Sequence, residues 1–163
     1  MVNSNSSRVD GQLTGHEYAN LVARYLASAY GSRGLVVYRE VSIGKSIIGK
    51  NRSIDILAVH PQTGQALAVE CKYQATAGTA DEKIPYALAD MDALWIPGVV
   101  VWAGEGFSDG VVQMLRGAKR AAWCRPDPTV VSRQPTASPS PQPYSAWTTS
   151  ASASSNKEVG SHF

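Results

Sequence analysis

Two acidic residues and a lysine stand on two short apolar segments, where buried strands normally carry no charge. The first segment, residues 53–60, contains Asp55, and the second, residues 66–74, contains Glu70 and Lys72. Because strand side chains two residues apart point to the same face, Glu70 and Lys72 project together. Both segments are rich in β-forming residues, and the Pro/Gly turn cluster at 61–64 predicts an antiparallel hairpin.

The turn leaves two registers open for this hairpin. A turn centred on residues 62 and 63 places Asp55 opposite Glu70, and a turn centred one residue later places it opposite Lys72. Directly opposed residues have Cβ atoms roughly 4.5–5.5 Å apart, so either register gathers the three side chains into one cluster. Two carboxylates that close repel each other unless a cation lies between them. The cluster therefore predicts a divalent metal site with a lysine beside it.

Helices and further strands must hold this hairpin in place. Thr14 followed by Glu17 matches a capping box and predicts a helix to about residue 30. Residues 35–41 are typical of a first strand, and residues 84–95 keep helical spacing. Residues 99–103 are apolar on both faces, which favours an internal or parallel strand. A last helix, capped at Ser108 or Asp109, reaches residue 122, so the predicted order is αβββαβα.

Basic residues gather in two segments next to the predicted cluster. Residues 42–52 contain two glycines and indicate a flexible loop that carries Lys45, Lys50, Asn51 and Arg52. Lys83 stands at the start of the helix after the second charged segment. Basic groups beside an acidic metal cluster are what a phosphate backbone needs, so we predict that both segments bind nucleic acid. The alternative for the first segment is a solvated hairpin tip.

The composition fits one folded domain with unstructured ends. The 163 residues are 44% hydrophobic and 17% charged, and the net charge of +2 is too small to indicate a nucleic-acid binder by itself. Residues 1–10 are rich in Asn and Ser, and residues 126–163 in Pro, Ser and Thr. Such segments bury too little apolar surface to fold, so we predict disorder there and a domain over 11–125.

The same sequence predicts a cytoplasmic protein without a membrane segment. No apolar run approaches the length that crosses a bilayer, and the first residues lack the apolar stretch of a secretory signal. The two cysteines indicate neither a disulfide framework nor a zinc site.

The element order, with Asp55 and the triplet Glu70-Cys71-Lys72, resembles the PD-(D/E)XK nuclease superfamily over residues 14–123, in particular small Holliday junction resolvase-like and phage endonucleases. Members place a glutamate in the first helix, an aspartate in the second strand, Glu-x-Lys in the third and often a polar residue after it. These positions fall here on Glu17, Asp55, Glu70, Lys72 and Gln74. Ile54 stands where the superfamily's name has proline. The resemblance implies an α/β fold with a restriction-endonuclease-like core, in which helices flank a central mixed four-stranded sheet.

The resemblance also implies Mg²⁺-dependent hydrolysis of phosphodiester bonds in DNA, with Mn²⁺ as a substitute. Asp55 and Glu70 would bind the metal, with the main-chain carbonyl of Cys71 as a third ligand. Glu17 would hold a second metal or its water shell. Lys72 would orient or deprotonate the attacking water and offset charge on the phosphate.

Other readings of the same residues stay open. A nucleic-acid-binding module can keep this fold without cleavage, and a restriction-type endonuclease can read a short sequence instead of a DNA structure such as a Holliday junction. A metal enzyme acting on a small phosphorylated substrate is disfavoured because the sequence has no phosphate-binding P-loop. The charged trio can also be a surface salt-bridge cluster. Because small nucleases usually address both strands of a duplex symmetrically, we expect a homodimer.

Overall fold

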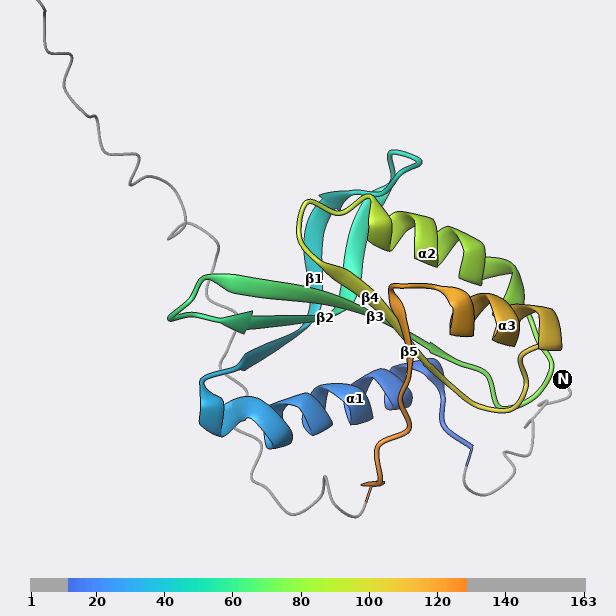
Figure 1. Cartoon of the computed structure of the whole chain (residues 1–163), viewed down its shortest axis with the longest axis horizontal. Coiled ribbons are helices and arrows are strands. Elements are labelled where there is room, and N and C mark those ends of the chain that lie inside the picture. The colour runs from blue at the N-terminus through green and yellow to red at the C-terminus, as the bar shows by residue number, and fades with distance from the viewer. Residues whose placement is uncertain (1–11, 129–163) are drawn as a thin grey trace, which may run out of the picture.

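The computed structural model describes residues 12–128, which form one mixed α/β domain (Figure 1). The elements follow the chain in the order α1 (Gly15–Tyr30), β1 (Val36–Lys45), β2 (Asn51–His60), β3 (Gln65–Tyr73), α2 (Ile84–Asp92), β4 (Gly98–Ala103), α3 (Asp109–Gly117) and β5 (Ala121–Trp123). Short 3₁₀ turns, η1 (Gly31–Arg33) and η2 (Asp81–Lys83), follow α1 and precede α2. None of the helices within this range combines the length and apolar character that crossing a bilayer requires.

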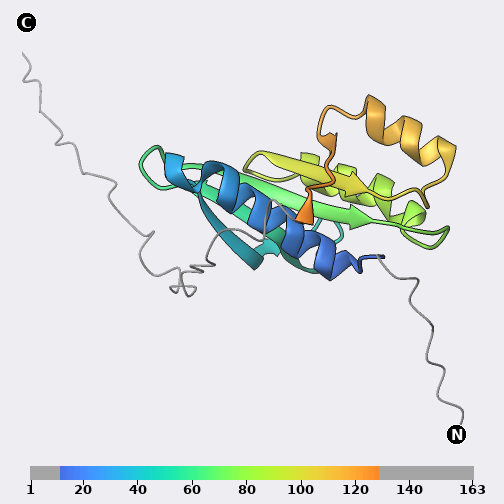
Figure 2. The same cartoon turned by 90° about the horizontal axis from the view of Figure 1, so that it is seen from below.

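The strands form a single sheet in the order β1-β2-β3-β4-β5. The first three strands pair antiparallel, and β4 and β5 continue the sheet in parallel to β3. Parallel neighbours need a crossover, which α2 supplies between β3 and β4 and α3 between β4 and β5. Helix α1 covers one face of the sheet, and α2 and α3 cover the other (Figure 2). The mixed α/β class is therefore confirmed.

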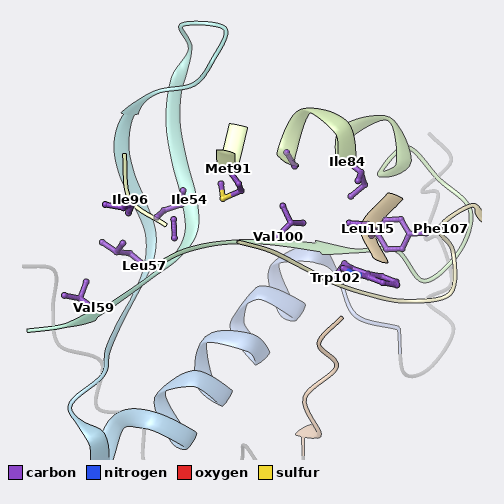
Figure 3. Close-up of a cluster of buried hydrophobic side chains, with 12 residues drawn as sticks. Ile54, Leu57, Val59, Ile84, Met91, Ile96, Val100, Trp102, Phe107 and Leu115 are labelled. Carbon is purple, nitrogen blue, oxygen red and sulfur yellow. The ribbon is translucent and has the colours of Figure 1, made fainter. Parts of the chain in front are cut away.

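Two apolar clusters hold the helices against the sheet. Under α1, Tyr18 and Val22 pack on Ile56, Val69 and Cys71. On the other face the cluster joins β2, β3 and β4 to α2 and α3 and includes Ile54, Leu57, Ile84, Met91, Val100, Trp102, Phe107 and Leu115 (Figure 3). Full burial of each large apolar side chain contributes roughly 1.5–3 kcal/mol, so the helix positions are set mainly by these contacts.

The β2–β3 hairpin adopts the first of the two predicted registers. Ile56 pairs with Val69, and His60 pairs with Gln65, which centres the turn on residues 62 and 63. The amides of residues 63 and 64 both donate to the carbonyl oxygen of His60. Gly64 has φ +67°, a conformation that glycine adopts without steric cost. This register brings Asp55 toward Glu70 rather than toward Lys72.

The end of the described chain differs from the prediction of four strands and a last helix reaching residue 122. Helix α3 ends at Gly117, and the main chain of Ala118 is extended. Residues 121–123 then pair in parallel with β4 as a fifth strand. The edge of β4 offers main-chain groups that need partners, and Val100 donates to the carbonyl oxygen of Arg120 at 2.8 Å. Pairing along this edge outweighs the weak helical pattern of three residues.

The flexible loop predicted over residues 42–52 is also wrong in extent. Strand β1 runs to Lys45 and β2 begins at Asn51, so only residues 46–50 form the turn. The register between the two strands shifts between Ser42 and Lys45, where Gly44 has φ +96°. Residues 41–54 therefore extend beyond the β2–β3 ladder as a paired arm. Figure 1 shows this arm rising toward α2.

Candidate functional site

A backbone irregularity in the β1–β2 pair places the first candidate residue. Arg39 pairs with Ile56 and Val41 pairs with Ile54, and between them Glu40 has φ +52°. Glu40 is the one non-glycine residue with a positive φ in residues 12–128, and this conformation costs roughly 1–2 kcal/mol. On β2, Ile54 and Ile56 belong to the two opposite core clusters, although residues two apart on a regular strand share a face.

Asp55 lies at this irregularity, where the β2–β3 ladder opens. The last pair of the ladder is Ile56 with Val69, and beyond it Asp55 Oδ2 accepts the Cys71 amide at 2.7 Å. The carboxylate thus replaces the main-chain carbonyl that would otherwise pair with this amide. Because the N–H and C=O of one strand residue point to the same side, the Cys71 carbonyl also points toward the opening. Arg39 Nε donates to the Asp55 carbonyl oxygen at 2.9 Å and holds the backbone in place.

Glu70 and Lys72 lie on β3 beside this opening, on the face that carries α2 and α3. They follow the alternation of Ala68, which belongs to the core cluster on that face. Lys72 Nζ donates to Glu70 Oε1 at 2.6 Å, and the two side chains are 19% and 21% exposed. Figure 3 shows β3 passing beneath the arm and α2 on this face. The structure therefore brings Asp55, Glu70 and Lys72 together as predicted.

Burial is the largest influence on the pKa of Glu70 in this cluster. Burial raises the pKa of Glu70, the Lys72 ammonium lowers it, the Asp55 carboxylate raises it again and Arg52 lowers it slightly, with a net rise. The neighbouring lysine therefore does not compensate for burial next to a second carboxylate. Such a site favours an added cation, since a cation stabilises both ionised carboxylates.

Glu17 lies at the start of α1, where it takes part in the cap of the helix. Its Oε2 accepts the Thr14 amide at 2.7 Å, and its own amide donates to Thr14 Oγ1 at 3.2 Å. This confirms the capping box that the sequence predicts. Within residues 12–128 the structure contains no group of three or more His, Cys, Asp or Glu side chains placed to hold a metal. A ligand role for Glu17 stays a prediction.

Gln74 is buried and links two loops at the end of β3. Its Nε2 donates to Asp81 Oδ1 at 2.9 Å and to the Gly106 carbonyl oxygen at 2.7 Å, and its Oε1 accepts the Ala80 amide at 2.8 Å. Gly104 is required beside it, because a Cβ there would lie 2.1 Å from the Gln74 carbonyl oxygen. These bonds occupy the amide, so Gln74 positions the loops that border the cluster.

The predicted nucleic-acid contacts separate into exposed and buried residues. Lys45, Lys50 and Asn51 are exposed at the end of the arm, and Lys83 is exposed in η2. Arg52 is only 6% exposed, and its guanidinium pairs with Asp90 Oδ2 at 2.8 Å. The burial of Arg52 corrects the prediction that it contacts a phosphate backbone.

Sequence reasoning missed two residues that shape the site. Arg39 holds the carbonyl of Asp55, and its side chain also bonds Asn20 of α1. Asp90 binds Arg52 and so fixes the arm to α2. Each is a charged residue within a mostly apolar segment, which indicates a buried charge that needs a partner. The sequence does not identify that partner, because it lies 16 residues away for Arg39 and 38 for Asp90.

Comparisons with known proteins identify the family. A family model described as a PD-(D/E)XK nuclease superfamily domain matches residues 14–138. Two solved structures are similar at low identity. One is a protein of unknown function (13% identity, TM-score 0.43, covering 64% of this chain and 56% of that chain). The other is a repair endonuclease from Pyrococcus abyssi (17% identity, TM-score 0.41, covering 74% of this chain and 50% of that chain).

This chain spans about half the length of those two proteins, at 56% and 50%. The sequence matches none of the curated proteins with which it was compared. The family match covers most of the chain, and the chain belongs to the PD-(D/E)XK nuclease superfamily.

Proposed function

We propose that the protein is a divalent-metal-dependent endonuclease that hydrolyses phosphodiester bonds in DNA. The observation that carries this proposal is the meeting of Asp55, Glu70 and Lys72 where the β2–β3 ladder opens. Membership of a nuclease superfamily supports the reaction class. The choice of metal and of DNA as the polymer rests on the chemistry of these side chains and of the arm beside them.

The donor atoms at the opening fit Mg²⁺. Asp55 and Glu70 offer carboxylate oxygens, and the main chain of Cys71 offers a carbonyl oxygen, all of them hard ligands. Burial raises the pKa of Glu70 and the Asp55 carboxylate adds to the rise, so a cation that stabilises the ionised carboxylates would be favoured there. Mg²⁺ usually keeps several waters and uses one or two carboxylates, so a two-carboxylate site is sufficient. Mn²⁺ suits the same ligands.

Asp55, Glu70, Lys72 and the groups that hold them have separate roles in the proposed hydrolysis. When bound, a divalent cation neutralises the phosphate and lowers the pKa of the attacking water. Glu70 holds the Lys72 ammonium at 2.6 Å, where it can donate to a phosphate oxygen or orient the water. The Cys71 amide fixes the Asp55 carboxylate, and Arg39 fixes the Asp55 backbone. Because these groups are held in advance, little reorganisation is needed during the reaction.

We propose that the DNA is selected by its structure. The paired arm carries Lys45 and Lys50 at its exposed end. Nearer the site, the charge of Arg52 lowers the pKa of Glu70, so the arm connects its tip to the site. Phosphate contacts of this kind position a duplex without reading its bases. We further propose that a homodimer addresses the two strands, which sedimentation of the protein with and without DNA would test.

A cleavage panel tests the proposal. Four-way junction, flap, linear duplex, single strand and RNA are each incubated with Mg²⁺, Mn²⁺, Ca²⁺ or EDTA. We expect cleavage of DNA with Mg²⁺ and Mn²⁺, and binding with little cleavage in Ca²⁺, whose looser coordination holds water and phosphate less tightly. Full cleavage in excess EDTA would exclude metal dependence. Binding without cleavage under every condition would instead identify a non-cleaving module of the same fold.

A further inference from the structure

The tip of the arm exposes two isoleucines at a position where turns usually carry small or polar residues. The Gly49 amide donates to the Ser46 carbonyl oxygen at 2.9 Å, which closes a turn with Ile47 and Ile48 at its centre. These two side chains are 48% and 60% exposed. Central turn positions favour Gly, Pro, Asn and Asp, and exposed aliphatic side chains there gain nothing from the fold. A contact outside the domain would explain them.

The tip is held in place. The Ile47 amide donates to Asp90 Oδ1 at 3.1 Å, and the other oxygen of Asp90 pairs with Arg52 at 2.8 Å. Arg52 also donates to the main-chain carbonyl oxygen of Asp90 at 2.9 Å. One buried carboxylate of α2 therefore fixes both the turn and the strand that follows it. The isoleucines are presented on a supported structure, which reduces the entropy lost when they bind a partner.

The charge around the tip identifies the kind of partner. Residues 41–54 contain Lys45, Lys50 and Arg52 and no acidic residue. Arg52 is neutralised by Asp90, but Lys45 and Lys50 remain at the surface on either side of the isoleucines. Lys45 contacts the neutral amide of Asn51 at 2.6 Å, so its charge stays uncompensated there. An apolar tip between two ammonium groups complements a polyanion with apolar faces, which describes the stacked bases and phosphates of DNA.

The tip also lies at a useful distance from the candidate site. The arm runs as β2 from Asn51 to Asp55. Four residues of extended strand span about 13 Å, at roughly 3.3 Å per residue. The turn adds up to about 7 Å between Asn51 and the isoleucines, and base pairs in duplex DNA are spaced about 3.4 Å apart, so the tip lies about four to six base pairs from Asp55. A duplex whose phosphate lies at Asp55 would therefore meet the tip within one helical turn.

We propose that Ile47 and Ile48 form an apolar wedge that packs against unstacked bases about four to six base pairs from the bond to be cleaved. This inference rests on the proposed nuclease function and names its substrate class, DNA that is kinked or easily unstacked. Proteins that insert apolar side chains between base steps use part of their contact energy to separate those bases. Mismatches, bulges and junctions need less of that energy, so the wedge selects them.

The test replaces the wedge and follows the bases directly. 2-Aminopurine is placed at successive positions along a short duplex, and any cleavage site on the same duplex is mapped separately in Mg²⁺. Wild type, the Ile47→Ser/Ile48→Ser variant and a Leu67→Ser control are compared in Ca²⁺. Leu67 is a suitable control because it is 37% exposed and lies on β3, away from the arm. Serine at these exposed sites should leave the melting temperature almost unchanged, and Ile48→Ser alone serves if the double variant is unstable.

We expect a rise in 2-aminopurine fluorescence about four to six base pairs from the cleavage site with wild type and with Leu67→Ser. The wedge variant should lose this rise and bind matched duplex about tenfold or more weakly, from the loss of apolar burial. Its affinity should fall less on a duplex with a bulge at that position, where the bases are already unstacked.

Two results would contradict the wedge. One is the absence of a fluorescence change with wild type, and the other is a wedge variant that binds and unstacks DNA as wild type does. A wedge variant whose only change is a shift in sedimentation from dimer to monomer would assign the tip to a protein contact. Failure of the nuclease proposal is distinct, because it would show as no cleavage of any substrate by wild type while binding and fluorescence still report on the wedge.

Discussion

Two ion pairs on the α2 side of the sheet differ in how completely their charges are matched. The side chains of Arg52 and Asp90 are 5% and 9% exposed and form an ion pair at 2.8 Å. Arg52 also donates to the Asp90 carbonyl oxygen. Lys72 and Glu70 are 19% and 21% exposed and joined at 2.6 Å, but Asp55 adds a second carboxylate close by. The first pair balances one positive charge with one negative charge. The second has an excess of negative charge at an opening in the sheet.

This difference separates a structural role from a chemical one. A buried pair with all its bonds made fixes two elements to each other, here the arm and α2. A pair that leaves negative charge uncompensated favours the binding of a further cation. We therefore expect substitutions in the first pair to change stability and substitutions in the second to change catalysis. Four predictions test this contrast, from the largest expected effect to the smallest.

Replacing Lys72 should have the largest effect. Lys72→Ala should lower the single-turnover rate of DNA cleavage by about a thousandfold, within the range for loss of a group that moves or orients a proton. Duplex affinity should change little, because the exposed arm lysines contribute most of the backbone attraction. Lys119→Ala, at an exposed lysine between α3 and β5, is the matched control and should cleave at a rate within a few-fold of wild type. Cleavage by Lys72→Ala at nearly the wild-type rate would contradict the assignment.

Breaking the matched pair should lower stability. Arg52→Met leaves Asp90 buried without its cation, which should reduce the free energy of unfolding by about 3–5 kcal/mol. Arg52→Met/Asp90→Leu replaces both charges with apolar groups and should recover a large part of that loss. Urea unfolding of the two variants measures the difference. Equal destabilisation by the single and double variants would show that packing, not charge, sets the cost.

Metal should stabilise the folded state through the unmatched pair. A cation that binds only the native protein raises its stability by about 2.7 kcal/mol at a hundredfold excess over Kd, which corresponds to a rise of several degrees in Tm. Thermal unfolding with Mg²⁺ and with EDTA should show this rise in wild type and lose it in Glu70→Gln. Asp92→Asn, at a surface pair with Arg120, should keep it. An equal rise in Glu70→Gln would place the cation elsewhere.

The smallest expected effect concerns the exposed lysines of the arm. Lys45→Ala/Lys50→Ala should bind DNA more weakly on unrelated sequences. The slope of log affinity against log salt should become shallower by about 1.8, at roughly 0.9 per phosphate contact. Arg52 is left unchanged because it is buried against Asp90. An unchanged slope in a salt titration would mean that the tip is only solvated and the binding surface lies elsewhere.

The shared face of Glu70 and Lys72 was predictable because strand periodicity is local. The spacing of Glu70 and Lys72 sets their shared face, and their ion pair confirms it. The register of the hairpin needed the structure, because the turn residues allow two pairings. Asp55 was expected to lie across the hairpin from Glu70 or Lys72, and the sequence did not indicate that its carboxylate accepts the Cys71 amide. Glu40, on β1 beside Asp55, has a positive φ that glutamate rarely adopts and that no sequence pattern indicates.

Long-range pairing explains the remaining differences. Arg52 looked like an exposed phosphate contact beside Lys45 and Lys50, but its partner Asp90 lies 38 residues further along the chain. The fifth strand was missed because its three residues continue the pattern of the preceding helix, and only the open edge of β4 makes them extended. Predicted disorder of residues 1–10 and 126–163 falls outside the described residues, except for 126–128. For Arg52 and for the fifth strand, the contact that decides the structure is made with a residue distant in the sequence.

The most direct test of the central claim is DNA cleavage by Asp55→Asn over a range of Mg²⁺ concentrations. Asparagine is isosteric, and its side-chain oxygen can still accept the Cys71 amide, so the opening should keep its shape while losing one carboxylate charge. Asp92→Asn is the control for loss of a surface carboxylate. We predict that Asp55→Asn cleaves no DNA at any Mg²⁺ concentration, whereas Asp92→Asn matches wild type. Cleavage by Asp55→Asn with the wild-type rate and Mg²⁺ dependence would contradict the account.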